Sequence, residues 1–174
     1  EKSAVPGHEG PIRNIIYDAL PQWAKELAQI DEMGNMWVEV GPPGPATVFL
    51  AHMDEVGYEI ESIDSSGVVN LTRLGGVVET AWEGQPALLQ LDPLINNESQ
   101  SASPSLRGVF NTRSVPKQKQ PDAMTAWFGM NRTQLEATGV RVGMGVTGYK
   151  EGHRMGPFRY SSRSLDDRVG TTSL

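Results

Sequence analysis

The sequence predicts an α/β fold that is interrupted by a small β-rich, barrel-like domain. Residues 9–20 place their apolar side chains at helical spacing. Residues 47–51, "TVFLA", form the unbroken apolar run that is typical of a strand covered on both faces. After Asp64, short β-rich runs separated by glycine replace this pattern, which favours a small antiparallel sheet or barrel.

Composition excludes several classes of protein. The 174 residues are 38% hydrophobic, which is enough for a core in one ordinary domain or two small ones. A net charge of -6 with 15 scattered Lys and Arg residues argues against nucleic acid as a partner. No apolar run approaches the roughly 20 residues of a membrane helix, so we expect no membrane partner. The lack of cysteine excludes thiolate metal sites and fits a cytoplasmic protein, without excluding secretion.

The first elements of the chain are predicted from periodicity and from turn residues. The helix expected over residues 9–20 is stopped by Pro21. Residues 25–31 and 36–41 each alternate apolar and polar side chains, and a turn at 33–35 separates them. We therefore expect two short strands here, joined by a tight connection.

The middle of the chain holds a long polar segment and a short helix. Residues 92–123 are rich in Ser, Gln, Asn and Pro around one expected strand at 105–110. Residues 131–139 predict a helix in which Asn131 is the N-cap and the glutamine three positions later completes a capping box. Residues 140–149 return to a β pattern.

The end of the chain, residues 164–174 or "SLDDRVGTTSL", predicts a turn that leads into a helix. The sequence stops soon after this helix begins, and short helices depend on packing over several turns. Glu1 is not a start methionine. We therefore expect the chain to be part of a longer protein.

Polar side chains follow directly after the predicted buried strand. His52 and Asp54 stand two positions apart and should project to the same side, whereas Met53 turns to the other face. A neutral imidazole is a common metal ligand, and a carboxylate on its other nitrogen fixes its tautomer. From "HMD" alone, however, a satisfied histidine at a strand end followed by an acidic turn is the commoner explanation.

The adjacent carboxylates of Asp166 and Asp167 form the second candidate group. Two neighbouring carboxylates repel each other unless a positive charge lies beside them, and either Arg168 or a metal ion supplies one. N-capping of the following helix explains the same residues equally well. Both explanations stay open from the residues alone.

Four segments carry a resemblance to a known family. "AHMDEVGYEIESIDSSGVVNLTRLGGV" and "LRGVFNTRSVP" are followed, in the same order as in that family, by "ATGVRVGMGV" and "SLDDRVG". With these segments the chain resembles the N-terminal half of the glutamyl aminopeptidase and tetrahedral-aminopeptidase family, the two-metal peptidases that were once described as cellulases.

The resemblance implies an architecture and an assembly. It implies a zinc-peptidase-like α/β/α sandwich, of which this chain holds a part, interrupted by a β-rich dimerisation domain. The corresponding boundaries are residues 1–64 for the first part of the catalytic domain, 65–160 for the inserted domain and 161–174 for the return to the catalytic domain. It also implies a homo-oligomer, either a dimer or a larger shell.

The resemblance further implies a chemistry. His52 and Asp166 would bind two divalent metal ions, zinc most of all with cobalt or manganese as alternatives, and Asp54 would support the site as its catalytic carboxylate. Asp166 is preferred over Asp167 because related patterns place a glycine four residues after the bridging aspartate, as Gly170 stands here. The implied reaction is hydrolysis of N-terminal residues of peptide substrates by a metal-activated water.

Two further expectations complete the prediction. In the family the general base and the remaining ligands follow later in the chain than Leu174, so residues 1–174 alone are expected to be inactive. His8 and His153 are expected to have ordinary surface roles. The alternative function is a non-catalytic assembly or peptide-binding module on a peptidase-like fold, which would offer an exposed strand edge to its partner.

Overall fold

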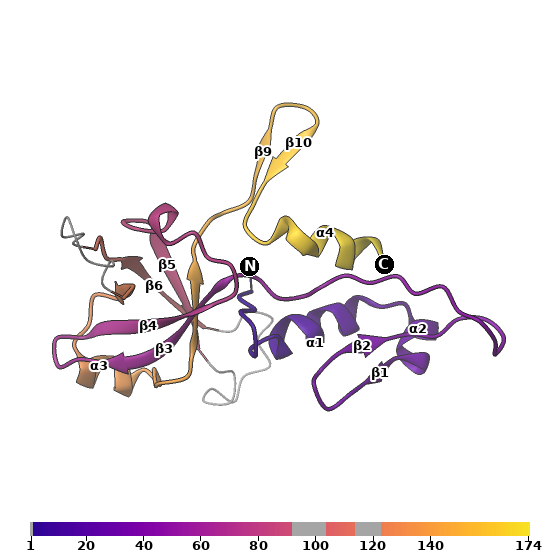
Figure 1. Ribbon diagram of the computed structural model, residues 1–174, viewed down its shortest axis with the longest axis horizontal. Helices are drawn as coiled ribbons and strands as arrows, with labels where there is room; N and C mark the ends of the chain where they lie inside the picture. The colour runs from indigo at the N-terminus through magenta and orange to yellow at the C-terminus, as the bar shows by residue number, and fades with distance from the viewer. Residues whose placement is uncertain (1, 92–103, 114–122) are drawn as a thin grey trace.

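The computed structural model describes residues 2–91, 104–113 and 123–174. Figure 1 shows an elongated molecule with a β-barrel at one end and the first two helices at the other. Most of the predicted polar segment at 92–123 lies outside the described residues. Its expected strand is present as part of the barrel.

Six antiparallel strands close into a barrel, which confirms the predicted β-rich unit. Their order around the barrel is β3-β4-β7-β6-β5-β8. The strands are short, and glycine-containing turns connect several of them, as the sequence indicated. Their bounds are β3 Gly57–Ile63, β4 Val68–Leu74, β5 Pro86–Gln90, β6 Ser105–Phe110, β7 Thr125–Trp127 and β8 Gly145–Gly148, with a 3-10 helix η1 at Glu79–Ala81.

The barrel interior is filled by side chains from alternate positions of its strands. Tyr58 and Ile60 of β3 are fully buried, and so is Phe110 of β6. Tyr58, Phe110 and Trp82 pack on one another, with ring centroids 5.6 Å apart for Tyr58 and Phe110 and 5.2 Å apart for Trp82 and Phe110. Tyr58 and Phe110 belong to the hydrophobic core, and the partly buried Trp82 packs against it.

Helix α3 (Arg132–Ala137) forms as predicted. The side chain of Asn131 accepts a hydrogen bond from the backbone of Gln134, and the Gln134 side chain accepts one from the Asn131 backbone, which completes the capping box. Leu135 is fully buried and belongs to the barrel core.

The N-terminal region differs from its prediction in one element. Helix α1 (Gly10–Ala19) is confirmed, but the expected strand over 25–31 is wrong in its first half. Residues 22–27 form a second helix, α2 (Gln22–Leu27), because Pro21 ends α1 and also has a backbone that suits the start of a helix. Only β1 (Gln29–Ile30) and β2 (Met36–Trp37) remain as strands.

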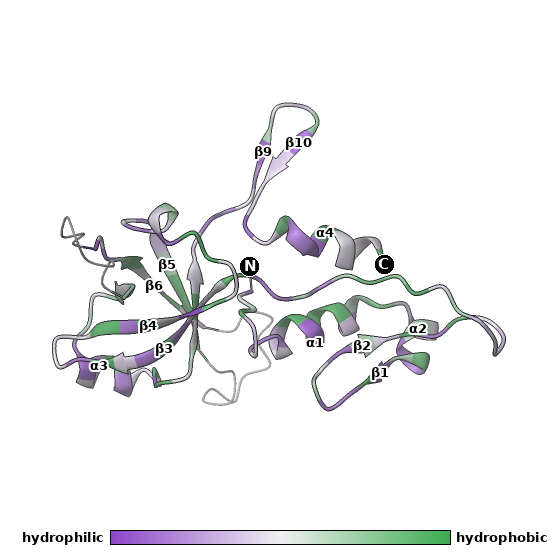
Figure 2. Ribbon diagram, viewed as in Figure 1, coloured by the Kyte–Doolittle hydropathy of each residue, from purple (hydrophilic) through white to green (hydrophobic). Residues whose placement is uncertain are grey.

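The predicted buried strand at 47–51 is also wrong. The segment is not assigned as a strand, and Val48, Phe49 and Leu50 are 72%, 74% and 87% exposed. A strand needs a neighbour for its backbone hydrogen bonds, and no strand within the described parts of the chain pairs with this segment. Figure 2 shows it as a hydrophobic stretch of chain running below the C-terminal helix. The apolar run predicted that this segment is buried. Burial and strand pairing are separate properties, so the run did not show whether a neighbouring strand is present.

The last elements lie outside the barrel. Strands β9 (His153–Met155) and β10 (Arg159–Ser161) form a hairpin that projects from the molecule, and helix α4 (Leu165–Ser173) follows it (Figure 1). None of the helices in the described ranges has the length and apolar character that crossing a membrane requires. Strand β3 precedes residue 65, where the sequence placed a domain boundary, and the division into domains stays a prediction.

The N-terminal segment is anchored on the barrel. Val5 is fully buried against Gly57, where an added Cβ would lie 2.3 Å from Val5 Cγ1 and 2.8 Å from the Val146 carbonyl oxygen. Only glycine allows this approach. The Ser3 backbone N–H also donates a hydrogen bond of 2.8 Å to the Gln90 side chain. The first residues are thereby held beside the start of β3, close to the candidate site.

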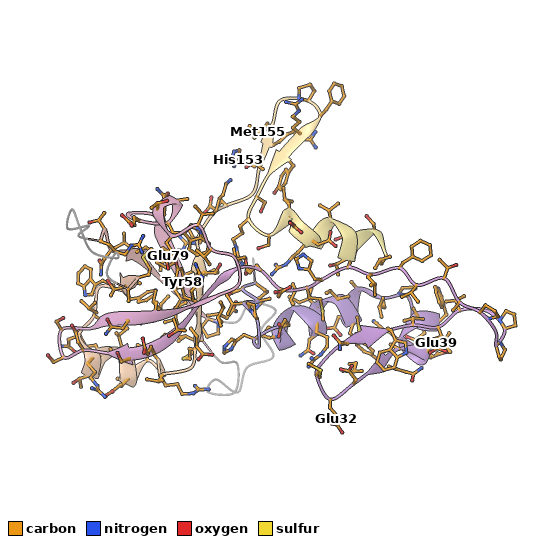
Figure 3. All side chains as sticks on the ribbon, viewed as in Figure 1. Glu32, Glu39, Tyr58, Glu79, His153 and Met155 are labelled. Atoms are coloured by element: carbon orange, nitrogen blue, oxygen red, sulfur yellow. The ribbon has the colours of Figure 1, made fainter. Side chains whose placement is uncertain are left out.

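Tyr58 provides a test of the core. Figure 3 labels Tyr58 among the strands of the barrel. Its hydroxyl has no hydrogen-bond partner in the described residues, and burial raises the pKa of Tyr58 to about 12. An unfolded tyrosine titrates at about pH 10. Because the unfolded phenol loses its proton at a lower pH than the buried one, this titration leaves the stability unchanged below about pH 10 and lowers it between about pH 10 and 12.

Tyr58→Phe is expected to unfold with a weaker pH dependence in that window, and at pH 7 to be as stable as the wild type or up to about 1 kcal/mol more stable. Urea unfolding at a series of pH values measures both effects. Tyr160→Phe, whose ring is exposed, is the control and should change stability at pH 7 by less than about 0.5 kcal/mol. A loss of more than 1 kcal/mol in Tyr58→Phe would show that the hydroxyl is satisfied.

Candidate metal centre

His52 lies between two carboxylates. Its Nδ1 is 2.8 Å from Asp54 Oδ1, and its Nε2 is 3.0 Å from Asp166 Oδ1. Asp54 is a local neighbour, whereas Asp166 is 114 residues away in the chain. The structure thus brings together all three residues that the sequence singled out.

Local backbone conformation explains how each side chain reaches this place. The chain around His52 has no regular structure, and His52 and Asp54 point the same way. Asp166 stands at the start of α4 with non-helical angles (φ -92, ψ 106), so its carboxylate leaves the helix direction and faces His52. The peptide bond between Asp166 and Asp167 is cis.

The two adjacent aspartates have different roles. Asp167 Oδ1 accepts a hydrogen bond of 3.0 Å from the Gly170 backbone N–H, three residues on, which is an N-capping contact. A Cβ at Gly170 would lie 2.5 Å from the Asp167 carboxylate oxygens, so this contact needs glycine. The capping explanation therefore fits Asp167, while Asp166 is the aspartate that contacts His52.

Further contacts join the segments that carry these three residues. Arg168 donates to the Lys2 carbonyl (3.0 Å), and its Nη2 is 3.6 Å from Glu55 Oε1. Thr171 Oγ1 donates to the His52 carbonyl (3.2 Å), which joins α4 to the segment before β3. Glu55 is only 7% exposed. Nothing in the sequence indicates this burial, because a glutamate after "HMD" is typical of an acidic turn.

The two neighbouring carboxylates favour the protonated, positively charged form of the His52 imidazole. The hydrogen bond to Asp166 raises the pKa of His52 above its ordinary value, and Asp54 adds to this effect. A neutral imidazole carries only one N–H, so contacts from both nitrogens to carboxylates require a proton on each nitrogen or a cation at one of them. The His52, Asp54 and Asp166 side chains are 53%, 36% and 95% exposed, and ion pairs this exposed contribute little to stability.

The donor atoms suit a divalent metal ion. Imidazole nitrogen and carboxylate oxygen are both zinc ligands, and two ligands of one tetrahedral zinc lie about 3.3 Å apart when the bonds are about 2.0–2.1 Å long. His52 Nε2 and Asp166 Oδ1, at 3.0 Å, need only a small shift to fit. Within the described ranges, no three or more His, Cys, Asp or Glu side chains form a group that could hold a metal ion.

The other two histidines lie elsewhere. His8 Nε2 is 3.4 Å from Glu59 Oε2 on strand β3. His153 stands on β9, on the projecting hairpin, where Figure 3 labels it beside Met155. The structure does not bring either of them into contact with His52 or Asp166 through any hydrogen bond or ion pair between described residues.

A cavity of about 600 Å³ opens beside His52. It lies between the end of the barrel and the start of α4, and it has both apolar and charged walls. A space of this size accommodates a small ligand or a terminal amino-acid residue. Its lining includes His52, Asp54, Val56, Trp82, Pro86 and Leu165.

Comparisons with known proteins point to one family. A family model described as M42 glutamyl aminopeptidase matches residues 34–174. The protein FrvX of Escherichia coli (strain K12), whose name describes it as an aminopeptidase, is 29% identical over 179 residues, covering 100% of this chain and 49% of that protein. The lysyl aminopeptidase of Pyrococcus furiosus is 24% identical over 177 residues, covering 97% and 49%. The chain thus spans about half the length of the curated relatives it matches.

Solved structures give the same fold. The aminopeptidase APDkam598 from the archaeon Desulfurococcus kamchatkensis superposes with a TM-score of 0.79 at 24% identity, covering 98% of this chain and 46% of that chain. The TET1 peptidase of Pyrococcus horikoshii, described as assembling into a tetrahedron or a large octahedral shell, gives 0.78 at 22% identity, covering 99% and 51%. At these identities the likeness establishes the architecture, including the α/β fold with its barrel.

Proposed function

The chain belongs to the M42 glutamyl aminopeptidase family, and on this premise we propose that it is part of a metal-dependent aminopeptidase that hydrolyses N-terminal residues from peptides. The observation that supports the proposal most is the contact between His52 and Asp166 across 114 residues of sequence. An exposed imidazole held between two carboxylates adds little to stability, so a functional reason for the arrangement is needed.

The proposed ligands are His52, through Nε2, and Asp166, with zinc as the expected ion and cobalt or manganese as alternatives. Held by these residues, a pair of divalent ions would supply a water of lowered pKa and would polarise the scissile carbonyl. With Nδ1 protonated, His52 would donate a hydrogen bond to Asp54, which fixes the tautomer and leaves the Nε2 lone pair available to a metal ion. The adjacent cavity of about 600 Å³ would receive the N-terminal residue of the peptide.

We also propose that the intact protein is a homo-oligomer. Support comes from the solved structures, one of which is described as a dodecamer. The β9–β10 hairpin projects from the rest of the molecule (Figure 1), and its apolar side chains are exposed: Phe158 is 94% exposed, Tyr160 58% and Met155 53%. Such a surface is more often found against a protein partner than in water.

Metal removal tests the proposed reaction. Incubation of the intact protein with a chelator is expected to abolish release of N-terminal residues from unblocked peptides, and addition of zinc, cobalt or manganese should restore it. The same peptide with an acetylated N-terminus is the substrate control and should stay uncleaved. Hydrolysis that persists after the chelator has removed all bound metal would rule out the proposal and would leave a non-metal hydrolase or a binding module to consider.

A further inference from the structure

We propose that Glu55 is a positioning residue. Its carboxylate binds the turn before Asp166 and so holds Asp166 in contact with His52. This inference rests on the proposed function of His52 and Asp166 as ligands. Glu55 follows Asp54 directly in the chain, yet its side chain is only 6% exposed and turns away from solvent into a set of donors.

Four groups converge on the Glu55 carboxylate. Oε2 accepts hydrogen bonds from Arg163 Nη1 and from Ser164 Oγ. Oε1 accepts a hydrogen bond of 3.0 Å from the Ala4 backbone N–H, and Arg168 Nη2 lies 3.6 Å from it. One buried carboxylate thus joins three distant parts of the chain: the N-terminal segment, the His52 segment and the turn before α4.

The link to Asp166 is short. Arg163 and Ser164 stand three and two residues before it. Ser164 has left-handed backbone angles (φ 57, ψ 22), a conformation that costs a non-glycine residue about 1 kcal/mol or more and persists only where its surroundings impose it. The hydroxyl contact to Glu55 is the side-chain contact that holds this residue. Without it, the turn can relax and carry Asp166 away from His52.

The N-terminal segment also contacts the two arginines that surround the Glu55 carboxylate. Arg163 Nη2 donates to the Lys2 carbonyl at 2.6 Å, and Arg168 Nη1 donates to the same oxygen at 3.0 Å. A buried network of this kind seldom adds net stability compared with apolar side chains of the same volume, but it fixes one arrangement over others. A residue that positions a metal ligand must likewise favour one arrangement over the others.

A second contact also ties α4 to the His52 segment, and it provides a comparison. Thr171 Oγ1 donates to the His52 carbonyl and to the Asp167 carbonyl. Thr171 lies on the far side of Asp166 from Ser164 and does not touch the left-handed turn. If Glu55 positions Asp166, Thr171→Val should disturb the contact between His52 and Asp166 less than Glu55→Gln does.

Crystal structures of metal-free variants of the intact protein test the proposal. In Glu55→Gln the His52 Nε2 to Asp166 Oδ1 distance is expected to exceed 3.5 Å, beyond hydrogen-bonding range, while the local contact between His52 and Asp54 stays near 2.8 Å. Glu61→Gln removes the same charge from an exposed site six residues away and should change neither distance. Ser164→Ala removes one hydrogen-bond donor to Glu55 and leaves the buried charges paired. If Glu55→Gln does not fold, the His52 to Asp166 distance in Ser164→Ala tests the positioning role instead.

Zinc affinity is the second readout. An outer partner of a metal ligand typically contributes 10- to 100-fold in affinity, so Glu55→Gln and Ser164→Ala should bind zinc that much more weakly than the wild type, with Glu61→Gln unchanged. An unchanged His52 to Asp166 distance in the folded variants would overturn the positioning role. Failure of the wild type to bind zinc would instead overturn the proposed function, and the distance measurement would still decide the role of Glu55.

Discussion

Asp166→Asn is expected to lower kcat/KM for peptide hydrolysis by at least about 100-fold, which corresponds to about 2.7 kcal/mol of transition-state stabilisation. The amide keeps the shape of the side chain but loses the negative charge that a divalent cation requires. Because the Asp166 side chain is 95% exposed, the free energy of unfolding should change by less than about 0.5 kcal/mol. Activity and urea unfolding of the intact protein measure the two effects, and His52→Ala should show the same separation.

Asp167 provides a matched control one residue away. Asp167→Asn retains an acceptor for the Gly170 N–H, so both activity and stability should stay close to the wild type. Asp167→Ala should cost about 0.5–2 kcal/mol of stability through loss of the cap. A large loss of activity in Asp167→Asn together with a normal Asp166→Asn would reverse the assignment of the two aspartates.

Phe110→Ala is expected to lower the free energy of unfolding by about 3–5 kcal/mol. Phe110 is fully buried and packs against both Tyr58 and Trp82, so truncation removes the apolar surface of the ring and leaves a cavity between two rigid aromatic side chains. The barrel is closed, which limits how far the surrounding strands can move inward to fill that space. The shift in the midpoint of urea unfolding measures the loss.

Val109 is the control for this core variant. It precedes Phe110 on β6, points to the opposite face and is 37% exposed. Val109→Ala should cost less than about 1 kcal/mol, since little of its side chain is removed from water. A larger loss in Val109→Ala than in Phe110→Ala would mean that the faces of β6 are assigned the wrong way round.

The elements that the sequence predicted are those whose signal is local. The capping box at Asn131 and Gln134 is formed within one turn of helix, so its residues identify it. Helix α1 follows from the spacing of its apolar side chains. The barrel follows from short β-rich runs separated by glycine, because such runs cannot form the longer elements of an alternating helix and strand pattern.

The elements that the sequence predicted wrongly depend on partners. Residues 47–51 have the composition of a buried strand, but pairing needs another strand beside them, and composition does not report its presence. Residues 25–27 alternate in polarity over too few positions to separate a strand from a helix, and Pro21 decided the outcome. Local patterns therefore gave the preference of each segment, and the surroundings determined its structure.

In the candidate site, too, the sequence predicts the local contacts, whereas contacts between distant segments do not follow from it. The sequence predicts His52 and Asp54 on one side through a strand end that the structure does not form, and the two side chains nevertheless meet through a local contact. The residues alone left Asp166 and Asp167 equivalent; the contact with His52 and the cap at Gly170 distinguish them. Glu55 was missed because its burial arises from three segments that are far apart in sequence.

Anomalous diffraction from crystals of the intact protein grown with zinc, recorded on both sides of the zinc absorption edge, tests whether His52 and Asp166 bind the same ion. We expect an anomalous peak about 2.0–2.2 Å from both His52 Nε2 and an Asp166 carboxylate oxygen. A zinc-loaded, active protein with no anomalous peak at this place, and with His52 still hydrogen-bonded directly to Asp166, would contradict this expectation.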